Sequence, residues 1–126
     1  MTSILVVDGD TSVRQFLRSV LEGAGYEVLE GSNGKEAMEE IRRNTLDLVI
    51  TALYMPVQDG SEMISALRKE YAALRLIAVV DRLRDFHQGA LLGTQVALNA
   101  RASMQKPLSA DAVLETVRRV LARNSS

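Results

Sequence analysis

The chain has 126 residues, 47% of them hydrophobic, which is enough for one compact domain and too little for two. We therefore expect a single domain over residues 1–126. Fifteen basic and sixteen acidic residues give a formal net charge of -1 without a run of five or six like charges, which argues against a nucleic-acid partner. The absence of cysteine excludes disulfides, thiolate metal sites and a cysteine nucleophile, and it suits a reducing cytoplasm.

The first apolar run, at residues 4–7, ends at Asp8. It is far too short for the core of a signal peptide or for a membrane span. We therefore expect no membrane contact and a cytoplasmic location.

Short apolar runs rich in β-branched residues alternate with segments of helical period along the chain. They predict strands at residues 4–7, 27–29, 48–51, 76–80 and, more weakly, 102–104. Continuous apolar runs are typical of strands that are buried on both faces. The alternation of strands and helices therefore predicts an α/β fold, with a parallel sheet covered by helices on both sides.

The first and last helices are marked by apolar stripes and by capping residues. Asp10 or Thr11 is available as the N-cap of the first helix, and Gly25 is its expected C-terminal stop. Ser109 is the expected cap of the last helix. These stripes indicate core packing and carry no chemistry.

The middle helices have weaker signals. Asn33 with Glu36 resembles a capping box, and so does Asp59 with Glu62. Two glycines in residues 85–100 lower helix propensity by about 1 kcal/mol each relative to alanine. We expect a loose or irregular helix there.

Ligands of an open parallel sheet bind beyond the carboxyl ends of its strands. We therefore expect the residues that follow the strands to converge in space. The first strand leads into Asp8-Gly9-Asp10, the third into residues 51–56, the fourth into Val80-Asp81 and the fifth into Gln105-Lys106-Pro107.

Several motifs, in a fixed order along nearly the whole chain, carry a resemblance to a known family. They are Ile4-Leu5-Val6-Val7-Asp8, the pair Gly31 and Gly34 before Glu36-Ala37, Asp47-Leu48-Val49-Ile50-Thr51, Met55-Pro56 followed by Asp59-Gly60, and Lys106-Pro107. Together they resemble the receiver domains of response regulators in two-component phosphorelay systems. The resemblance implies a flavodoxin-like, doubly wound five-stranded parallel sheet of order 2-1-3-4-5 with five helices. It also implies an acidic pocket that takes a phosphoryl group from a histidine kinase.

The resemblance identifies where this chain departs from the family's pocket. Phosphoryl transfer to a carboxylate needs an aspartate nucleophile, a Mg²⁺ ion, a cation and a hydroxyl group. Where the family has two adjacent acids after the first strand, this chain has Asp8 and Gly9. Where the family has the phosphoacceptor, this chain has Ala52, whose methyl group cannot attack phosphorus.

The switch positions of the family differ as well. The hydroxyl residue that ends the fourth strand corresponds to Val80, or to Asp81 if the alignment shifts by one, and neither supplies a hydroxyl. The aromatic residue three positions before the family's lysine corresponds to Ser103. What remains of the pocket, beside the first aspartate, is Lys106 and the carbonyl of Tyr54.

The surviving residues have alternative interpretations. Asp8 and the Tyr54 carbonyl could be remnants of a magnesium site, but one carboxylate beside a carbonyl is a poor Mg²⁺ site. An ion pair of Asp8 with Lys106 is the better interpretation, so we expect no cofactor and weak or no Mg²⁺ binding. Asp10 could replace Gly9 as a second acid, yet an N-cap role is favoured by roughly four to one. The resemblance raises the expectation of a cis peptide bond before Pro107.

Two further residues could be given a chemical role. Thr51 precedes the vacant acceptor position, but successive strand residues point to opposite faces, so it should face away from the pocket. His87 is the single histidine, and a place in a loop or at a helix start is favoured by roughly nine to one over phosphotransfer or metal binding.

The leading hypothesis is a signalling module, not an enzyme, that binds protein partners without phosphorylation at the usual site. The partners expected from the resemblance are a histidine kinase, an effector or an output protein, with a homodimer as another possibility. The resemblance places these contacts on residues 84–100, 102–104 and 111–123. One alternative is an ordinary phosphorylatable regulator whose acceptor was replaced deliberately. The other is a small flavodoxin-like enzyme or nucleotide-binding domain, although no phosphate-binding glycine motif follows the first strand.

Overall fold

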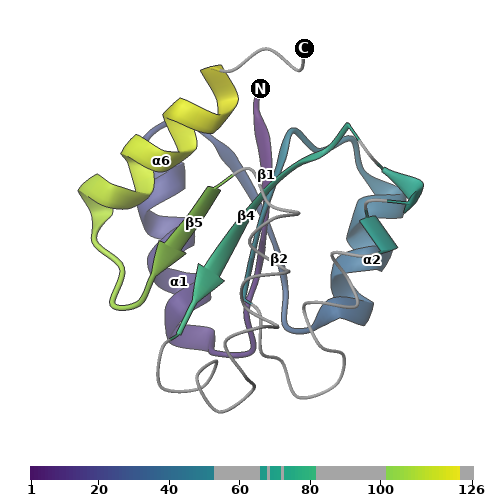
Figure 1. Ribbon diagram of the computed structural model, residues 1–126, viewed down its shortest axis with the longest axis horizontal. Coiled ribbons are helices and arrows are strands. Elements are labelled where there is room, and N and C mark those ends of the chain that lie inside the picture. Colours follow the sequence, from purple (N-terminus) through teal and green to yellow (C-terminus); the bar gives the residue numbers. More distant parts are fainter. Residues whose placement is uncertain (53–65, 68, 72, 82–101, 123–126) are drawn as a thin grey trace.

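The computed structural model describes residues 1–52, 66–67, 69–71, 73–81 and 102–122. Figure 1 shows the sheet with helices on both of its sides. The elements are β1 (Ser3–Val7), α1 (Thr11–Gly23), β2 (Glu27–Gly31), α2 (Gly34–Arg43), β3 (Leu48–Ala52), β4 (Arg75–Val80), β5 (Ala102–Gln105) and α6 (Ala110–Ala122).

The five strands form one parallel sheet in the order β2-β1-β3-β4-β5. This confirms both the predicted strands and the strand order implied by the resemblance. Val7 lies opposite Gly31 of β2 and Thr51 of β3, and Ala52 lies opposite Val79 of β4. The carboxyl ends of the strands therefore meet along one edge of the sheet.

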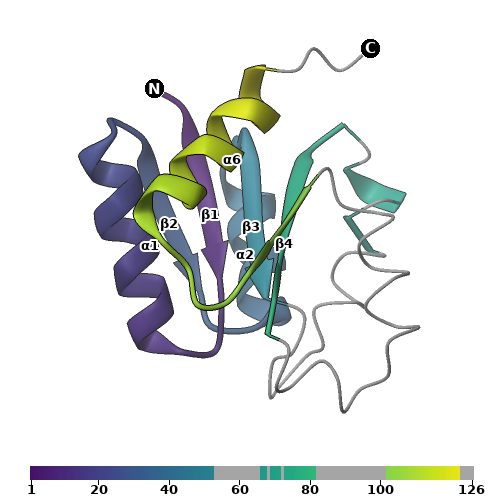
Figure 2. The same ribbon diagram turned by 60° about the vertical axis from the view of Figure 1, so that its left-hand side comes forward.

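Each face of the sheet carries its own apolar cluster. Along β1, Ile4 and Val6 pack into the cluster that α1 and α6 cover, whereas Leu5 and Val7 pack into the cluster that α2 covers. Figures 1 and 2 show α1 and α6 together on one side of the sheet and α2 on the other. A strand covered on both faces needs apolar residues at every position, which explains the continuous runs in the sequence.

The ends of α1 and the start of α6 follow the predicted caps. The Asp10 carboxylate accepts a hydrogen bond from the Ser12 N–H at 2.9 Å, so Asp10 is the N-cap of α1. Gly25, just beyond the end of that helix, has a φ of +93°, a conformation that glycine adopts without strain. The Ser109 hydroxyl accepts a hydrogen bond from the Ala112 N–H at 3.2 Å in the first turn of α6.

The predicted capping box of α2 is half correct. Asn33 accepts a hydrogen bond from the Glu36 N–H at 2.9 Å, as expected for an N-cap. The Glu36 carboxylate, however, accepts from the N–H and hydroxyl of Ser32 instead of returning to Asn33. These hydrogen bonds lower the pKa of Glu36. Ser32, one residue before the N-cap, has both an N–H and a hydroxyl that donate to Glu36. The Glu36 side chain therefore turns to Ser32 and not to the Asn33 N–H.

Three of the five expected helices, α1, α2 and α6, lie within the described residues. Residues 66–67 and 69–70 are also helical. The predicted cap at Asp59 and the predicted irregular helix at residues 85–100 lie outside the described residues. Among the residues that are described, no helix is long and apolar enough to span a bilayer.

Candidate functional site

Asp8 follows β1 at the carboxyl edge of the sheet and is only 4% exposed. Its backbone N–H donates to the Gly31 carbonyl of β2 at 3.1 Å, and its own carbonyl accepts from the Arg14 guanidinium of α1. Its side-chain Oδ1 accepts from the Asp10 N–H at 2.9 Å. Contacts from β2, α1 and the connecting loop therefore fix the position of this carboxylate.

Lys106 approaches the same carboxylate from the end of β5. Its Nζ lies 3.1 Å from Asp8 Oδ2, so the ion pair predicted from the sequence is present. The lysine backbone N–H donates to the Val80 carbonyl at 2.9 Å, which ties the residue to the end of β4. The Lys106–Pro107 peptide bond is cis, as the resemblance suggested. The side chain of Asp8 is 5% exposed and that of Lys106 is 22% exposed, so the pair is largely shielded from water.

Ala52 closes β3 at this edge and is 4% exposed. Its methyl group packs into the cluster under α2, together with Val7 and Ala78. Thr51, directly before it, is fully buried, and its hydroxyl donates to the Ala52 carbonyl at 3.0 Å. Thr51 lies in register with Val7 of β1 and Ala78 of β4.

The other predicted pocket positions are spread around this edge. Val80 is half-buried at the end of β4, and Gly9 and Ser103 are exposed. Asp10 uses its carboxylate to cap α1. The carbonyl of Tyr54 and the side chain of His87 lie outside the described residues.

Comparison with known proteins places this geometry in a family. The model of the response regulator receiver domain matches residues 4–118. The chain belongs to this family. The receiver fold also explains why the sheet has a flavodoxin-like order and why the pocket residues follow its strands.

The receiver is similar to the alkaline phosphatase synthesis transcriptional regulatory protein PhoP of Bacillus subtilis, with 31% identity over 121 residues that cover 96% of this chain and 49% of the relative. It thus spans about half the length of that regulator. It is 29% identical over 119 residues to the chemotaxis protein CheY of Bacillus subtilis, covering 94% of this chain and 96% of that protein. Among solved structures, the response regulator TrrA of Thermotoga maritima, in complex with Mg²⁺-BeF, superposes with a TM-score of 0.81 at 27% identity, covering 95% of this chain and 99% of TrrA.

The described residues of the receiver's pocket supply few donors for a magnesium ion. Mg²⁺ prefers carboxylate and other hard oxygen ligands in octahedral geometry. Asp8 supplies one carboxylate, whose Oδ1 accepts from the Asp10 N–H. Its Oδ2 lies 3.1 Å from Lys106 Nζ but has no hydrogen-bond partner among the described residues. In the described part of the receiver, no group of three metal-ligating side chains comes together.

The receiver also holds an ionic network that the sequence analysis missed. Glu30 of β2 contacts Arg14 Nε at 3.0 Å and Arg18 Nε at 2.7 Å, and Arg18 contacts Glu22 at 2.9 Å. Burial raises the pKa of Glu30, but hydrogen bonds from Arg18 and Arg14 outweigh burial and lower that pKa overall. The sequence does indicate part of this network, because Arg14, Arg18 and Glu22 are spaced by four residues and therefore lie on one face of α1. Because Arg14 also binds the Asp8 carbonyl, this network supports the pocket from the side of β2.

Proposed function

We propose that this receiver binds protein partners without phosphorylation at the position that the family uses. Ala52 carries the proposal, because it occupies the end of β3 with a buried methyl group. Transfer of a phosphoryl group needs an attacking oxygen, and a methyl group has none. The hydroxyl of the preceding residue, Thr51, is fully buried and donates to the Ala52 carbonyl.

The ion pair supports the same proposal. Asp8 and Lys106 neutralise each other at 3.1 Å, and Gly9 adds no second carboxylate beside them. Crowded carboxylates repel each other and favour a divalent cation between them, whereas a paired acid and base do not. We therefore propose that the pocket is stable without Mg²⁺ and is held in one arrangement by its own side chains.

The proposed partners are proteins: a histidine kinase, an effector, an output protein or a second copy of the receiver. The surface to examine first consists of residues 84–100, β5 and α6. Residues 84–100 lie outside the described part. On β5, Ser103 and Gln105 are exposed, and α6 exposes charged side chains of both signs. Such a mixed polar surface favours a partner with a complementary charge pattern over an apolar obligate interface.

The decisive experiment treats the receiver with acetyl phosphate and Mg²⁺, and separately with beryllium fluoride and Mg²⁺, the ligand named for TrrA. We expect no phosphorylated protein by intact mass and no Mg²⁺-dependent change of melting temperature. Bacillus subtilis CheY, treated in parallel, is the matched control for reagents and detection. Stoichiometric labelling of the native receiver, or a large stabilisation by Mg²⁺ with beryllium fluoride, would refute the proposal.

A second candidate is an ordinary phosphorylatable regulator with a replaced acceptor. The Asp8–Lys106 pair favours it, because this pair keeps two of the pocket residues in contact. The variants Ala52→Asp and Ala52→Asp/Gly9→Asp distinguish the two. Labelling of the double variant but not of the native chain would indicate recent or deliberate loss of the acceptor. An unlabelled double variant would indicate that the pocket has diverged beyond these two positions.

A further inference from the structure

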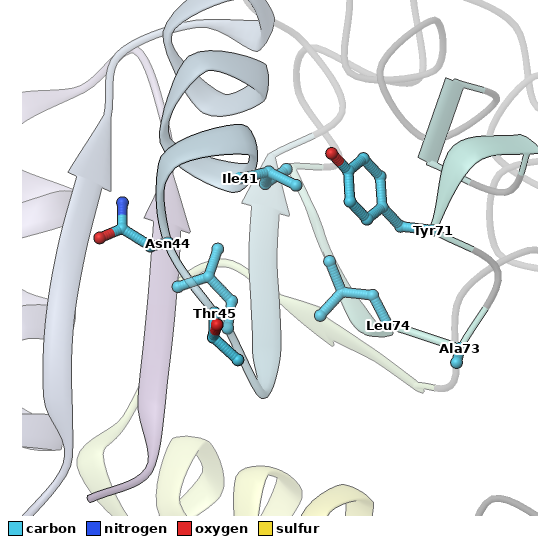
Figure 3. A pocket seen from close by; sticks show the side chains of 7 residues that line it. Ile41, Asn44, Thr45, Tyr71, Ala73 and Leu74 are labelled. Carbon is cyan, nitrogen blue, oxygen red and sulfur yellow. The ribbon is translucent and has the colours of Figure 1, made fainter.

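A cavity of about 370 Å³ lies at the other edge of the sheet, where α2 ends and where β3 and β4 begin. Figure 3 shows Ile41 of α2 and Tyr71, which precedes β4, pointing toward each other across this space. Thr45 and Leu46 line it from the segment before β3, and Leu74 lines it from the segment before β4. Its volume falls at the lower end of the range of about 300–1,000 Å³ that is usual for small-molecule sites.

Among the residues that the structure describes, the lining of the cavity carries no charged side chain. Charged residues make up 25% of the whole chain, so the described part of the lining is less charged than the chain as a whole. The ion pair of Arg42 with Glu70, at 3.6 Å, comes from the same two segments but is not part of the lining. A charged ligand would give up its hydration there without gaining a partner of opposite charge, so the lining selects for neutral molecules.

The lining offers polar groups beside its apolar walls. Ile41, Leu46 and Leu74 supply apolar surface, and Thr45 and Tyr71 supply hydroxyl groups. Within the part of the chain that the structure describes, neither hydroxyl has a hydrogen-bond partner, so both can serve a ligand. A few polar groups in a mostly apolar concave wall are typical of sites that bind small molecules.

The cavity borders the apolar core that α2 covers. Ile41 is 4% exposed and belongs to the same apolar cluster as Ala52, and Leu46, Tyr71 and Leu74 pack against that cluster. A ligand would therefore extend an existing packed layer instead of resting on an isolated surface.

We infer that this cavity binds a small uncharged molecule with an apolar body of about one ring and one hydrogen-bonding group. The apolar walls take the ring, and the hydroxyls of Thr45 and Tyr71 take the polar group. The site is independent of the proposed function, because it lies at the opposite ends of the strands from Ala52 and does not require phosphorylation or its absence.

The test titrates nitrogen-labelled receiver with benzamide and follows the backbone amide signals by NMR. Benzoate, which has nearly the same shape but a negative charge, is the matched ligand. We expect saturable shifts from benzamide, centred on Ile41, Leu46 and Tyr71, and at least about tenfold weaker binding of benzoate.

Variants locate the site and assign the hydroxyl. Thr45→Trp places a large side chain at an exposed position of the lining and should weaken benzamide binding at least about tenfold. Ser19→Trp adds the same side chain at an exposed position of α1, on the other face of the sheet, and should leave binding unchanged. Tyr71→Phe removes only a hydroxyl, keeps the ring, and should weaken benzamide binding about threefold to tenfold.

Three results would overturn the inference: no saturable shift up to the solubility of benzamide, equal binding of benzoate, or unchanged binding by the Thr45→Trp variant. Shifts of the same amides with protein concentration alone would also overturn it, because they would assign the cavity to a second copy of the chain. Failure of this test leaves the acetyl phosphate experiment unaffected, since that experiment reports on Ala52.

Discussion

Replacing Lys106 by methionine is expected to destabilise the receiver more than the same replacement of an exposed lysine. Methionine keeps an unbranched apolar side chain of similar length and removes the ammonium group. The substitution leaves the Asp8 carboxylate, 5% exposed, without the cation that lies 3.1 Å from its Oδ2.

The structure sets the magnitude of this effect. Removing one partner of a buried ion pair costs about 3–5 kcal/mol, because the other charge stays buried. Here Lys106 is 22% exposed, so water reaches the site, and Asp8 Oδ1 keeps its hydrogen bond from the Asp10 N–H. We therefore expect a loss of about 2–3 kcal/mol in the free energy of unfolding, or about 8–12 °C in melting temperature.

A double-mutant cycle isolates the pair. Asp8→Asn leaves a lysine that can turn toward water and should cost only about 1 kcal/mol. In the double variant neither charge is left alone, so its loss should fall short of the sum of the single losses by about 1–2 kcal/mol. Urea unfolding at neutral pH, followed by circular dichroism, measures all four proteins, and Lys35→Met, at an exposed position of α2, is the control with an expected change within about 0.5 kcal/mol. Strict additivity, or a Lys106→Met variant as stable as the control, would refute the reasoning.

Three further predictions concern the supports of the pocket. Gly31→Ala puts a Cβ 3.2 Å from the Ala37 backbone nitrogen and should cost about 1 kcal/mol by urea unfolding, so unchanged stability would mean that α2 shifts freely. Glu30→Gln should destabilise the receiver at pH 7 and much less at pH 3. The pKa of Glu30 is lowered in the folded state, so its contribution is complete above the unfolded value of about 4.3 and is lost as the pH falls through the folded value. An equal loss at both pH values would contradict this, with Glu39→Gln on the exposed face of α2 as the control. Asn33→Ala removes the N-cap of α2 and should cost about 1 kcal/mol, whereas Asn33→Asp, which keeps the acceptor, should cost much less in the same assay.

The strands and most helix caps could be predicted because their signals are local. A strand buried on both faces needs apolar residues at every position, and residues 4–7 show this without knowledge of any partner. The same logic failed at the end of β2, which runs to Gly31 and not to residue 29. In the sequence, the charge of Glu30 ends the apolar run and so predicts the end of the strand. In the folded state Arg14 and Arg18 pair with this charge, and the strand continues through Glu30.

The sequence by itself determined that the receiver lacks a carboxylate at Ala52, because the presence of an attacking oxygen is a property of the residue alone. It also determined the alternation of strands and helices, since periodicity and caps act over a few residues. Only the tertiary structure decided that Arg14 supports Asp8 while binding Glu30, and that Ile41 and Tyr71 border one cavity. Arg14 and Glu30 are 16 positions apart in the chain, Ile41 and Tyr71 are 30 positions apart, and all of these arrangements depend on how the helices pack against the sheet.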